Sequence, residues 1–133
     1  MDREKAIDEA KFSSGELREA LVERHSEETQ QKLERGRVAI AGLGGLGSNV
    51  AIALTRIGVG HLHLLDFDRV DLTNLNRQQY FLDQVGRYKT EALLETLQRI
   101  NPYLDIRLDT VKIIDENIEE LFQEDEIVCE AFD

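Results

Sequence analysis

Three glycines spaced as G-x-G-x-x-G lie where a short apolar run gives way to a helical pattern, within residues 38–68. Gly42 permits a tight turn, Gly44 lets the backbone approach a phosphate, and Gly47 lets the helix pack close to the strand. The start of the helix presents unpaired N–H groups and partial positive charge to an anion. The spacing therefore predicts a phosphate-binding turn, which also includes Gly45.

An acidic residue, Asp66, ends the next apolar run, nineteen residues after Gly47. A carboxylate at the end of a second strand is placed to accept hydrogen bonds from ribose hydroxyls. A strand, a glycine turn, a helix and this acid, in that order, favour nucleotide binding over a turn that serves packing alone. They do not distinguish a nicotinamide dinucleotide from another nucleotide.

About twenty residues without helical or strand periodicity follow Asp66, and long loops in compact domains are usually functional. The candidate site residues there are Asp68, Asn74 and Arg77, with Lys89 at the start of the next helical pattern. An arginine offers a rigid fork of donors, a lysine a mobile point charge, and an asparagine an uncharged donor. Taken singly, each could equally be a surface charge, a turn residue or a helix cap.

Strand and helix patterns alternate around these residues. Apolar runs predict strands over 37–41, 61–66, 104–113 and 126–132. Helical periodicity predicts helices over 45–58, 87–100 and 116–122, the second with Leu93, Leu94, Leu97 and Ile100 on one face and an end at Asn101. This order predicts an α/β fold, a Rossmann-like parallel sheet with right-handed crossovers and helices on both faces.

The N-terminal residues 1–35 are polar, with scattered apolar positions. Ser13 followed by Glu16 fits a capping box and predicts a helix from about residue 14. The segment has too few apolar residues for its own core, so we expect it to pack on the main domain or on a partner subunit. We therefore divide the chain into an N-terminal helical extension, 1–35, and an α/β domain, 36–133.

Charge is distributed unevenly over the 133 residues, whose net charge is −11. Residues 105–133 hold eleven acidic and two basic side chains, whereas residues 36–104 hold six acidic and seven basic ones. A chain that binds a nucleic-acid backbone would have the opposite balance. The sequence shows neither a signal-peptide pattern nor an apolar run long enough for a membrane span, and we expect a cytoplasmic protein that does not bind membranes.

Four stretches together resemble one known family: GLGGLGS, LLDFDRVDLTNLNRQQYF, VGRYK and RINP. Over residues 37–133 they are similar to the ThiF/MoeB/HesA group of the ubiquitin-activating-enzyme superfamily, and NLNRQQYF is most similar to its ThiF branch, the sulfur carrier protein adenylyltransferases of thiamine biosynthesis. The resemblance implies ATP and Mg²⁺ as cofactors. It also implies activation of a small ubiquitin-like sulfur carrier protein, which ends in Gly-Gly, as an acyl-adenylate, and a homodimer.

The resemblance also implies roles for individual residues. Arg77 would contact the β- and γ-phosphates, Lys89 the α-phosphate and the transition state, and Asn74 the phosphates or the attacking carboxylate. Asp133, which we expect to end the fourth strand, matches the aspartate that holds magnesium. The family also uses an N-terminal arginine that often reaches a neighbouring subunit's site, for which Arg24 is a candidate.

We expect structural roles for the remaining side chains that could react or bind a metal. Cys129, the one cysteine, lies in an apolar run and is expected to be a buried thiol rather than a nucleophile. His61 and His63 alternate on a strand without a third ligand, which argues against a zinc site, and His25 is expected at the surface. Because relatives continue beyond the last residues, we expect the N-terminal portion of a longer enzyme, truncated at the C-terminal side, that keeps the nucleotide site and loses full activity.

Three other functions stay open. The first is a related enzyme that adenylates the molybdopterin carrier or a tRNA base, although a tRNA substrate predicts a basic surface. The second is a nicotinamide-dependent oxidoreductase domain, which would bind NADH without magnesium. The third is a non-catalytic module that binds the carrier with no response to ATP.

Overall fold

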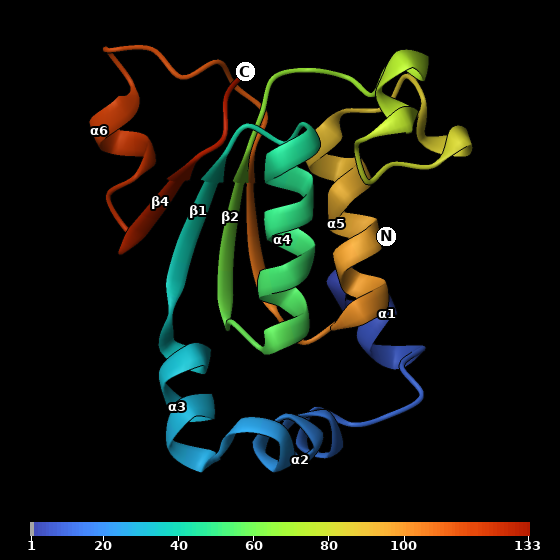
Figure 1. The fold of residues 1–133 in the computed structure, drawn as a ribbon, viewed down its shortest axis with the longest axis vertical. Helices are drawn as coiled ribbons and strands as arrows, with labels where there is room; N and C mark the ends of the chain where they lie inside the picture. Colours follow the sequence, from blue (N-terminus) through green and yellow to red (C-terminus); the bar gives the residue numbers. More distant parts are fainter. Residues whose placement is uncertain (1) are drawn as a thin grey trace.

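Four parallel strands form the centre of the computed structural model, which describes residues 2–133 (Figure 1). They are β1 (Arg37–Ala41), β2 (His61–Leu65), β3 (Asp105–Asp109) and β4 (Ile127–Glu130), in the sheet order β3-β2-β1-β4. The register places Ala39 of β1 between His63 of β2 and Val128 of β4. The chain steps from β1 outward to β3 and then returns to the other side of β1, so the strand order reverses beside β1.

Two long helices cover one face of this sheet (Figure 1). Helix α4 (Gly45–Ile57) connects β1 to β2, and α5 (Lys89–Ile100) precedes β3. The core lies between them and the sheet and includes Val38, Ile40, Leu62, Leu64, Leu93 and Leu97. The opposite face is covered in part by the short α6 (Ile118–Leu121) and the turn after it, whose Asp125 contacts His63. The predicted Rossmann-like sheet with helices on both faces is therefore confirmed.

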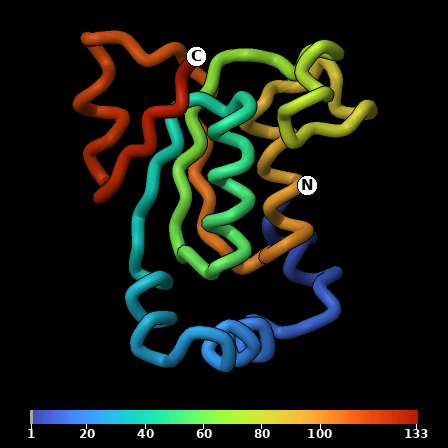
Figure 2. The backbone as a smooth tube through the Cα atoms, in the orientation of Figure 1, coloured from blue at the N-terminus to red at the C-terminus, as the bar shows by residue number. Residues whose placement is uncertain are grey.

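The N-terminal segment forms three helices, α1 (Arg3–Asp8), α2 (Ser14–His25) and α3 (Glu27–Arg35). The capping box predicted at Ser13 and Glu16 is present at the start of α2. Helices α2 and α3 lie across the end of the sheet where the strands begin, and the chain then enters β1 (Figure 2). Arg3 donates to the Tyr103 carbonyl at 2.8 Å, so the segment packs on the α/β body. None of the helices within residues 2–133 is long and apolar enough to cross a bilayer.

The long loop between β2 and α5 is an ordered structure with two 3₁₀ turns, η1 (Leu72–Asn76) and η2 (Leu82–Gln84). Its two ends pair with each other, because the Val70 N–H donates to Arg87 O at 2.8 Å and the Lys89 N–H donates to Asp68 O at 3.0 Å. This pairing brings the start of α5 beside the end of β2.

The C-terminal strands are shorter than predicted. Strand β3 ends at Asp109 because the chain leaves the sheet there, and β4 ends at Glu130. Asp133 therefore lies three residues beyond β4 and does not end it. Ile127 and Val128 are 58% and 45% exposed, because β4 is an edge strand and α6 buries none of its residues.

Three smaller expectations also differ from the structure. Cys129 is half-buried rather than buried, because only one side of its edge strand packs on the core. His25 is half-buried rather than at the surface, with Nε2 2.7 Å from Gln30 Oε1. On α5, Ala92 packs in the core and the predicted core residue Leu94 is only half-buried, because it faces the edge of the helix interface.

Candidate functional site

A cleft of about 420 Å³ opens at the carboxyl ends of the strands. It is lined by Gly42, Leu43, Gly44, Leu65, Asp66, Phe67, Asp68, Lys89, Val111, Lys112, Ile113, Ala131, Phe132 and Asp133. The residues after β1 form one wall and the residues after β4 form another, so the cleft lies where the strand order reverses. Ligands of open α/β sheets bind at this kind of position.

The glycine turn, residues 42–47, has the geometry that its spacing predicts. Gly42 has φ of 99°, a left-handed conformation that favours glycine, and a Cβ on Gly47 would lie 1.7 Å from the Gly42 carbonyl oxygen. Gly44 lines the cleft and begins α4 without any side-chain cap. The first N–H groups of α4 are therefore left for an anion. Gly45 follows at the first position of the helix, against the backbone of Arg77.

Asp66 connects the glycine turn to the long loop. Its Oδ2 accepts a hydrogen bond from the Leu43 N–H and its Oδ1 accepts one from the Asp68 N–H, both at 2.8 Å. The carboxylate is thus held rigidly at the edge of the cleft. Each carboxylate oxygen retains a lone pair with which it can accept a hydrogen bond from a ribose hydroxyl.

Lys89 is the cation that the structure brings to the glycine turn. It is only 6% exposed and lines the cleft, and its ammonium forms no hydrogen bond or ion pair with any described residue. It also begins α5, where the helix dipole disfavours a positive charge. Most of the side chain is shielded from solvent but the ammonium is not fully enclosed, so a cation without a hydrogen-bond partner is left to an anionic ligand in the cleft.

The charge of Lys89 reaches the turn that follows β2. The pKa of Asp71 lies below its ordinary value, first because the Thr73 hydroxyl and N–H donate to its carboxylate, and further because the Lys89 ammonium is near. The Asp71 carboxylate caps η1, with the Thr73 N–H at 3.0 Å. The cation and the cap of the loop are therefore electrostatically linked.

Asn74 and Arg77 do not line the cleft. Asn74 Oδ1 accepts the Asp71 N–H at 2.8 Å, so this oxygen serves as part of a helix cap, the alternative role considered for it from sequence. Arg77 Nη1 donates to Asn76 Oδ1 at 2.9 Å and to Thr73 O at 3.3 Å. The stem of Arg77 lies beside Gly45, but its guanidinium folds back on η1.

Tyr80 holds the loop against the glycine turn, a role that the sequence analysis missed. Its hydroxyl donates to the Leu43 carbonyl at 2.6 Å and is buried. Burial first, and then the Asp66 carboxylate, raise the pKa of Tyr80 above its ordinary value, so the phenol stays protonated and donates. The only sequence signal was an aromatic residue within a polar loop.

Ser48, Gln78 and Gln79 form a second connection between the loop and the start of α4. Ser48 Oγ donates to the Gly44 carbonyl at 2.5 Å and accepts the Gln79 N–H at 3.2 Å. The Gln78 side chain is buried beside Gly44, with an Oε1 that has no partner among the described residues. These side chains fix the distance between the loop and the start of α4.

A magnesium ion would find suitable oxygen ligands on the other side of the cleft. Asp133 is exposed, lines the cleft together with Asp68, and makes no hydrogen bond or ion pair with the described residues. Residues 2–133 contain no cluster of three or more histidine, cysteine or acidic side chains placed around one metal position. Magnesium bound with phosphate oxygens needs only one or two carboxylates, so this donor set fits it.

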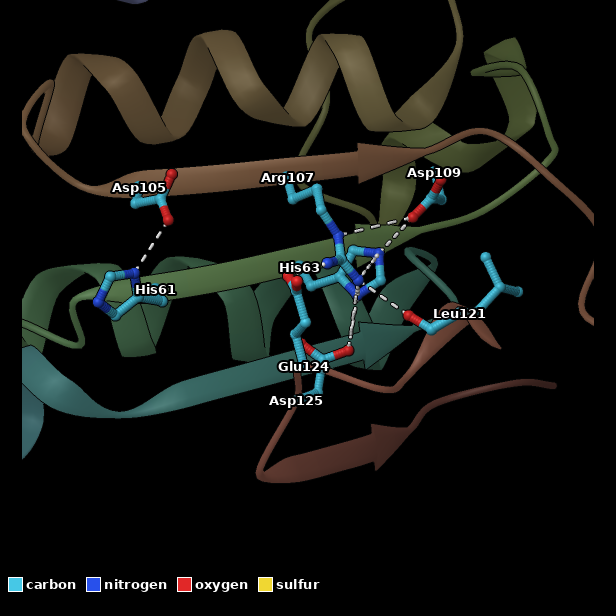
Figure 3. Close-up of polar contacts among 8 residues, drawn as sticks. All are labelled: His61, His63, Asp105, Arg107, Asp109, Leu121, Glu124 and Asp125. Carbon is cyan, nitrogen blue, oxygen red and sulfur yellow. Dashed lines mark hydrogen bonds and ion pairs between the residues drawn. The ribbon is translucent and has the colours of Figure 1, made fainter. Parts of the chain in front are cut away.

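Two other groups of candidate residues lie away from the cleft. His61 pairs with Asp105, and His63 lies between Asp109 and Asp125 on the sheet face opposite α4 and α5 (Figure 3). Arg24 lies on α2, at the opposite end of the sheet from the cleft (Figure 1). Within one chain, Arg24 is therefore not part of the cleft.

Comparison with known proteins gives relatives that are named as adenylyltransferases or activating enzymes. Molybdopterin-synthase adenylyltransferase of Escherichia coli strain K12 is 41% identical over 105 residues, which is 78% of this chain and 42% of that protein. Ubiquitin-like modifier-activating enzyme 5 of Drosophila persimilis is 41% identical over 103 residues, 77% of this chain and 25% of that protein. The chain spans between 18% and 43% of the length of such curated relatives.

Solved structures agree with the sequence relatives. The E. coli tRNA N6-threonylcarbamoyladenosine dehydratase TcdA, in complex with ATP, superposes with a TM-score of 0.85 at 28% identity, covering 93% of this chain and 53% of that one. E. coli MccB with AMPCPP and MccA gives a TM-score of 0.70 at 34% identity, over 74% of this chain and 30% of that one. The ThiF family model matches residues 17–133, all of the α/β body together with α3 and most of α2. The glycine turn, the ordered loop after β2 and this match lead to one conclusion: the chain belongs to the ThiF family.

Proposed function

We propose that this chain supplies the ATP site of an adenylyltransferase that activates the C-terminal carboxylate of a small ubiquitin-like sulfur carrier protein. The observation that carries the proposal is the Lys89 ammonium, which has no hydrogen-bond or ion-pair partner among the described residues, in the same cleft as the uncapped start of α4. The names of the relatives, adenylyltransferases and activating enzymes, support this class of reaction. The ATP bound to a protein of the same fold supports the choice of nucleotide.

The reaction joins two anions. A carboxylate oxygen of the carrier attacks the α-phosphorus of ATP, and the bond from that phosphorus to the bridging oxygen breaks. Pyrophosphate leaves with the electron pair, and the carrier becomes an acyl-adenylate. The protein's contribution is positioning and neutralisation of charge. Lys89 neutralises charge at the α-phosphate, the N–H groups of α4 hold a phosphate, and Asp66 binds the ribose.

The remaining candidate residues act on the side of the leaving pyrophosphate. Arg77 binds the β- and γ-phosphates after its guanidinium leaves Asn76 and Thr73. Asn74 donates from its amide nitrogen while its Oδ1 continues to cap η1. Asp133 and Asp68, which both line the cleft, would hold magnesium, and the bound ion would neutralise charge on pyrophosphate.

The substrate we propose is the Gly-Gly-ended sulfur carrier of thiamine biosynthesis, activated in the cytoplasm by a homodimer. The stretch NLNRQQYF supports the thiamine carrier. The molybdopterin carrier is the second candidate, favoured by the 41% identity to molybdopterin-synthase adenylyltransferase. The net charge of −11 argues against a tRNA substrate, although TcdA shares the fold.

Calorimetric titration with ATP, in the presence and absence of magnesium, tests the nucleotide site. We expect ATP binding that strengthens with magnesium and weakens in Lys89→Ala and Arg77→Ala, and no quenching of NADH fluorescence. Binding of NADH without magnesium would overturn the proposal in favour of an oxidoreductase domain.

ATP–pyrophosphate exchange with each carrier in turn tests the substrate. We expect exchange that is weak, because this portion is predicted to lack full activity, but that depends on the thiamine sulfur carrier and is lost when its last two glycines are removed. Exchange with the molybdopterin carrier alone would select the second candidate. Carrier binding that does not respond to ATP would indicate a non-catalytic module.

A further inference from the structure

The sheet face opposite α4 and α5 carries a cluster of charged side chains around a buried histidine (Figure 3). His63 of β2 is 2% exposed, and the side chain of Asp125, on the turn after α6, is 6% exposed. Arg107 and Asp109 of β3 and Glu124 of the same turn complete this group, which we call the His63 cluster. A buried histidine surrounded by charges is not required by the nucleotide site and needs its own explanation.

Both ring nitrogens of His63 meet a carboxylate. Nε2 lies 2.6 Å from Asp109 Oδ2, and Nδ1 lies 2.7 Å from Asp125 Oδ2. Arg107 Nη2 also lies 2.9 Å from Nδ1 and 3.3 Å from Nε2. The ring of His63 is therefore held by polar contacts with two carboxylates and one guanidinium at once.

The two carboxylates stand at the two ends of one connection. Asp109 is the last residue of β3, and Asp125 lies two residues before β4. Between them, residues 110–126 are exposed or half-buried, and α6 buries no residue. Apart from His63, the segment is held by Thr110 Oγ1 to Thr90 Oγ1 at 2.6 Å and by Arg107, which reaches Leu121 O and Glu124 Oε2, both at 2.8 Å. The Glu126 N–H also donates to Arg37 O at 3.0 Å.

This connection carries part of the wall of the cleft. Val111, Lys112 and Ile113 follow directly after β3, and Ala131, Phe132 and Asp133 follow directly after β4. Whatever holds the connection against the sheet therefore also sets the position of that wall.

We propose that His63 is a positioning residue, which pins both ends of residues 110–126 through Asp109 and Asp125 and thereby keeps the far wall of the cleft in place for nucleotide. The proposal rests on the proposed function for its ligand, ATP with magnesium. It makes nucleotide affinity depend on contacts made on the opposite face of the sheet from α4.

The charged groups that face His63 come from several elements. They are Arg107 and Asp109 from β3, Glu124 and Asp125 from the turn after α6, Arg37 from β1, and the neighbouring pair His61–Asp105. Without the His63 ring, Asp109 and Asp125 lose the contact that joins them, so residues 110–126 should loosen and nucleotide affinity should fall.

The matched control is His61, on the same strand and the same face. His61 is also paired with an aspartate, Asp105 at 2.9 Å, but that pair joins β2 to β3 and does not touch residues 110–126. His63→Gln removes contacts with two aspartates and His61→Gln removes a contact with one, and only the first variant acts on residues that hold the connection. Asp125→Ala removes the contact with His63 from the side of the turn after α6. This variant still tests the proposal if His63→Gln does not fold.

Hydrogen–deuterium exchange and calorimetry with magnesium-ATP on the full chain provide the two readouts. We expect His63→Gln and Asp125→Ala to raise exchange in residues 110–126 and to weaken ATP binding at least about fivefold, with the double variant no worse than either one. His61→Gln should match the wild type in both.

Folded His63→Gln and Asp125→Ala proteins with wild-type exchange and wild-type affinity would overturn the proposal, as would an equal loss in His61→Gln. If the wild type binds no ATP, the proposed function fails. The hydrogen–deuterium exchange of residues 110–126 then shows by itself whether His63 holds the connection.

Discussion

The Tyr80 hydroxyl donates a 2.6 Å hydrogen bond to the Leu43 carbonyl, across 37 positions of the sequence. This bond fastens the loop that carries Asn74 and Arg77 to the turn that carries the glycines. The relative position of the two motifs therefore depends on a residue that belongs to neither set of candidate ligands.

Replacing Tyr80 with phenylalanine should destabilise the protein by about 1–2 kcal/mol, because the Leu43 carbonyl would stay buried without its donor. ATP affinity should weaken as the loop loosens. Urea denaturation and calorimetry measure the two effects. Tyr103→Phe is the control, since its hydroxyl donates to Phe12 O at 2.6 Å in an exposed position far from the cleft. If Tyr80→Phe lowers neither quantity more than Tyr103→Phe does, the role we assign to Tyr80 is wrong.

Gly47→Ala should cost roughly 3 kcal/mol or more, because the added methyl carbon would lie 1.7 Å from the Gly42 carbonyl oxygen and the helix would have to move away from the turn. ATP binding should be lost with it. Thermal denaturation and a nucleotide titration test this. Gly15→Ala, in the first turn of α2 with no neighbour nearer than 3.9 Å, should be tolerated. A stable Gly47→Ala protein that binds ATP normally would contradict the predicted close approach.

Lys89→Met should separate stability from binding. The ammonium forms no hydrogen bond or ion pair with the described residues, so its removal should change the free energy of unfolding little. ATP affinity should nevertheless fall by about ten- to hundredfold, the loss expected for one hydrogen bond to a charged group. Arg99→Met, at the exposed end of the same helix, should change neither. A loss of stability with normal ATP affinity would show that Lys89 is a structural residue.

Asp71→Ala should lower the urea midpoint at neutral pH, because it removes the cap of η1. The lowered pKa of Asp71, caused first by the Thr73 hydroxyl and N–H, fixes the pH dependence. A carboxylate with a lowered pKa stabilises the fold above its unfolded pKa of about 3.9, and this contribution disappears as pH falls through the folded value. The difference between wild type and variant should therefore narrow below about pH 4. Asp83→Ala, in the first turn of η2, is the control, and an equal effect there would argue against the cap.

Local patterns predicted most of the elements. The capping box at Ser13 and the end of α5 at Asn101 lie where the sequence places them. The strands after residue 104 were predicted too long, because alternation of apolar residues continues past the point where the chain leaves the sheet. The exposure of β4 was not predictable from its apolar composition, since it results from an edge position in the sheet.

The candidate site was predicted as a set of residues but not as an arrangement. Asp66 and Lys89 line the cleft with Gly42 and Gly44, as the motif indicates, whereas the Arg77 guanidinium folds away from it. The rotamer of a long exposed side chain is decided by its neighbours, and spacing in the sequence carries no information about it.

By itself, the sequence determined the order of strands and helices, the glycine turn and the family, because these depend on short-range periodicity and on residue types at fixed spacing. Only the tertiary structure decided that Tyr80 docks the loop, that Lys89 is buried without a partner, and that His63 joins Asp109 to Asp125. Each of these rests on contacts between residues far apart in the chain. Such contacts form when the parallel sheet brings separate strand ends together, and this distance in sequence is the reason that no local pattern reveals them.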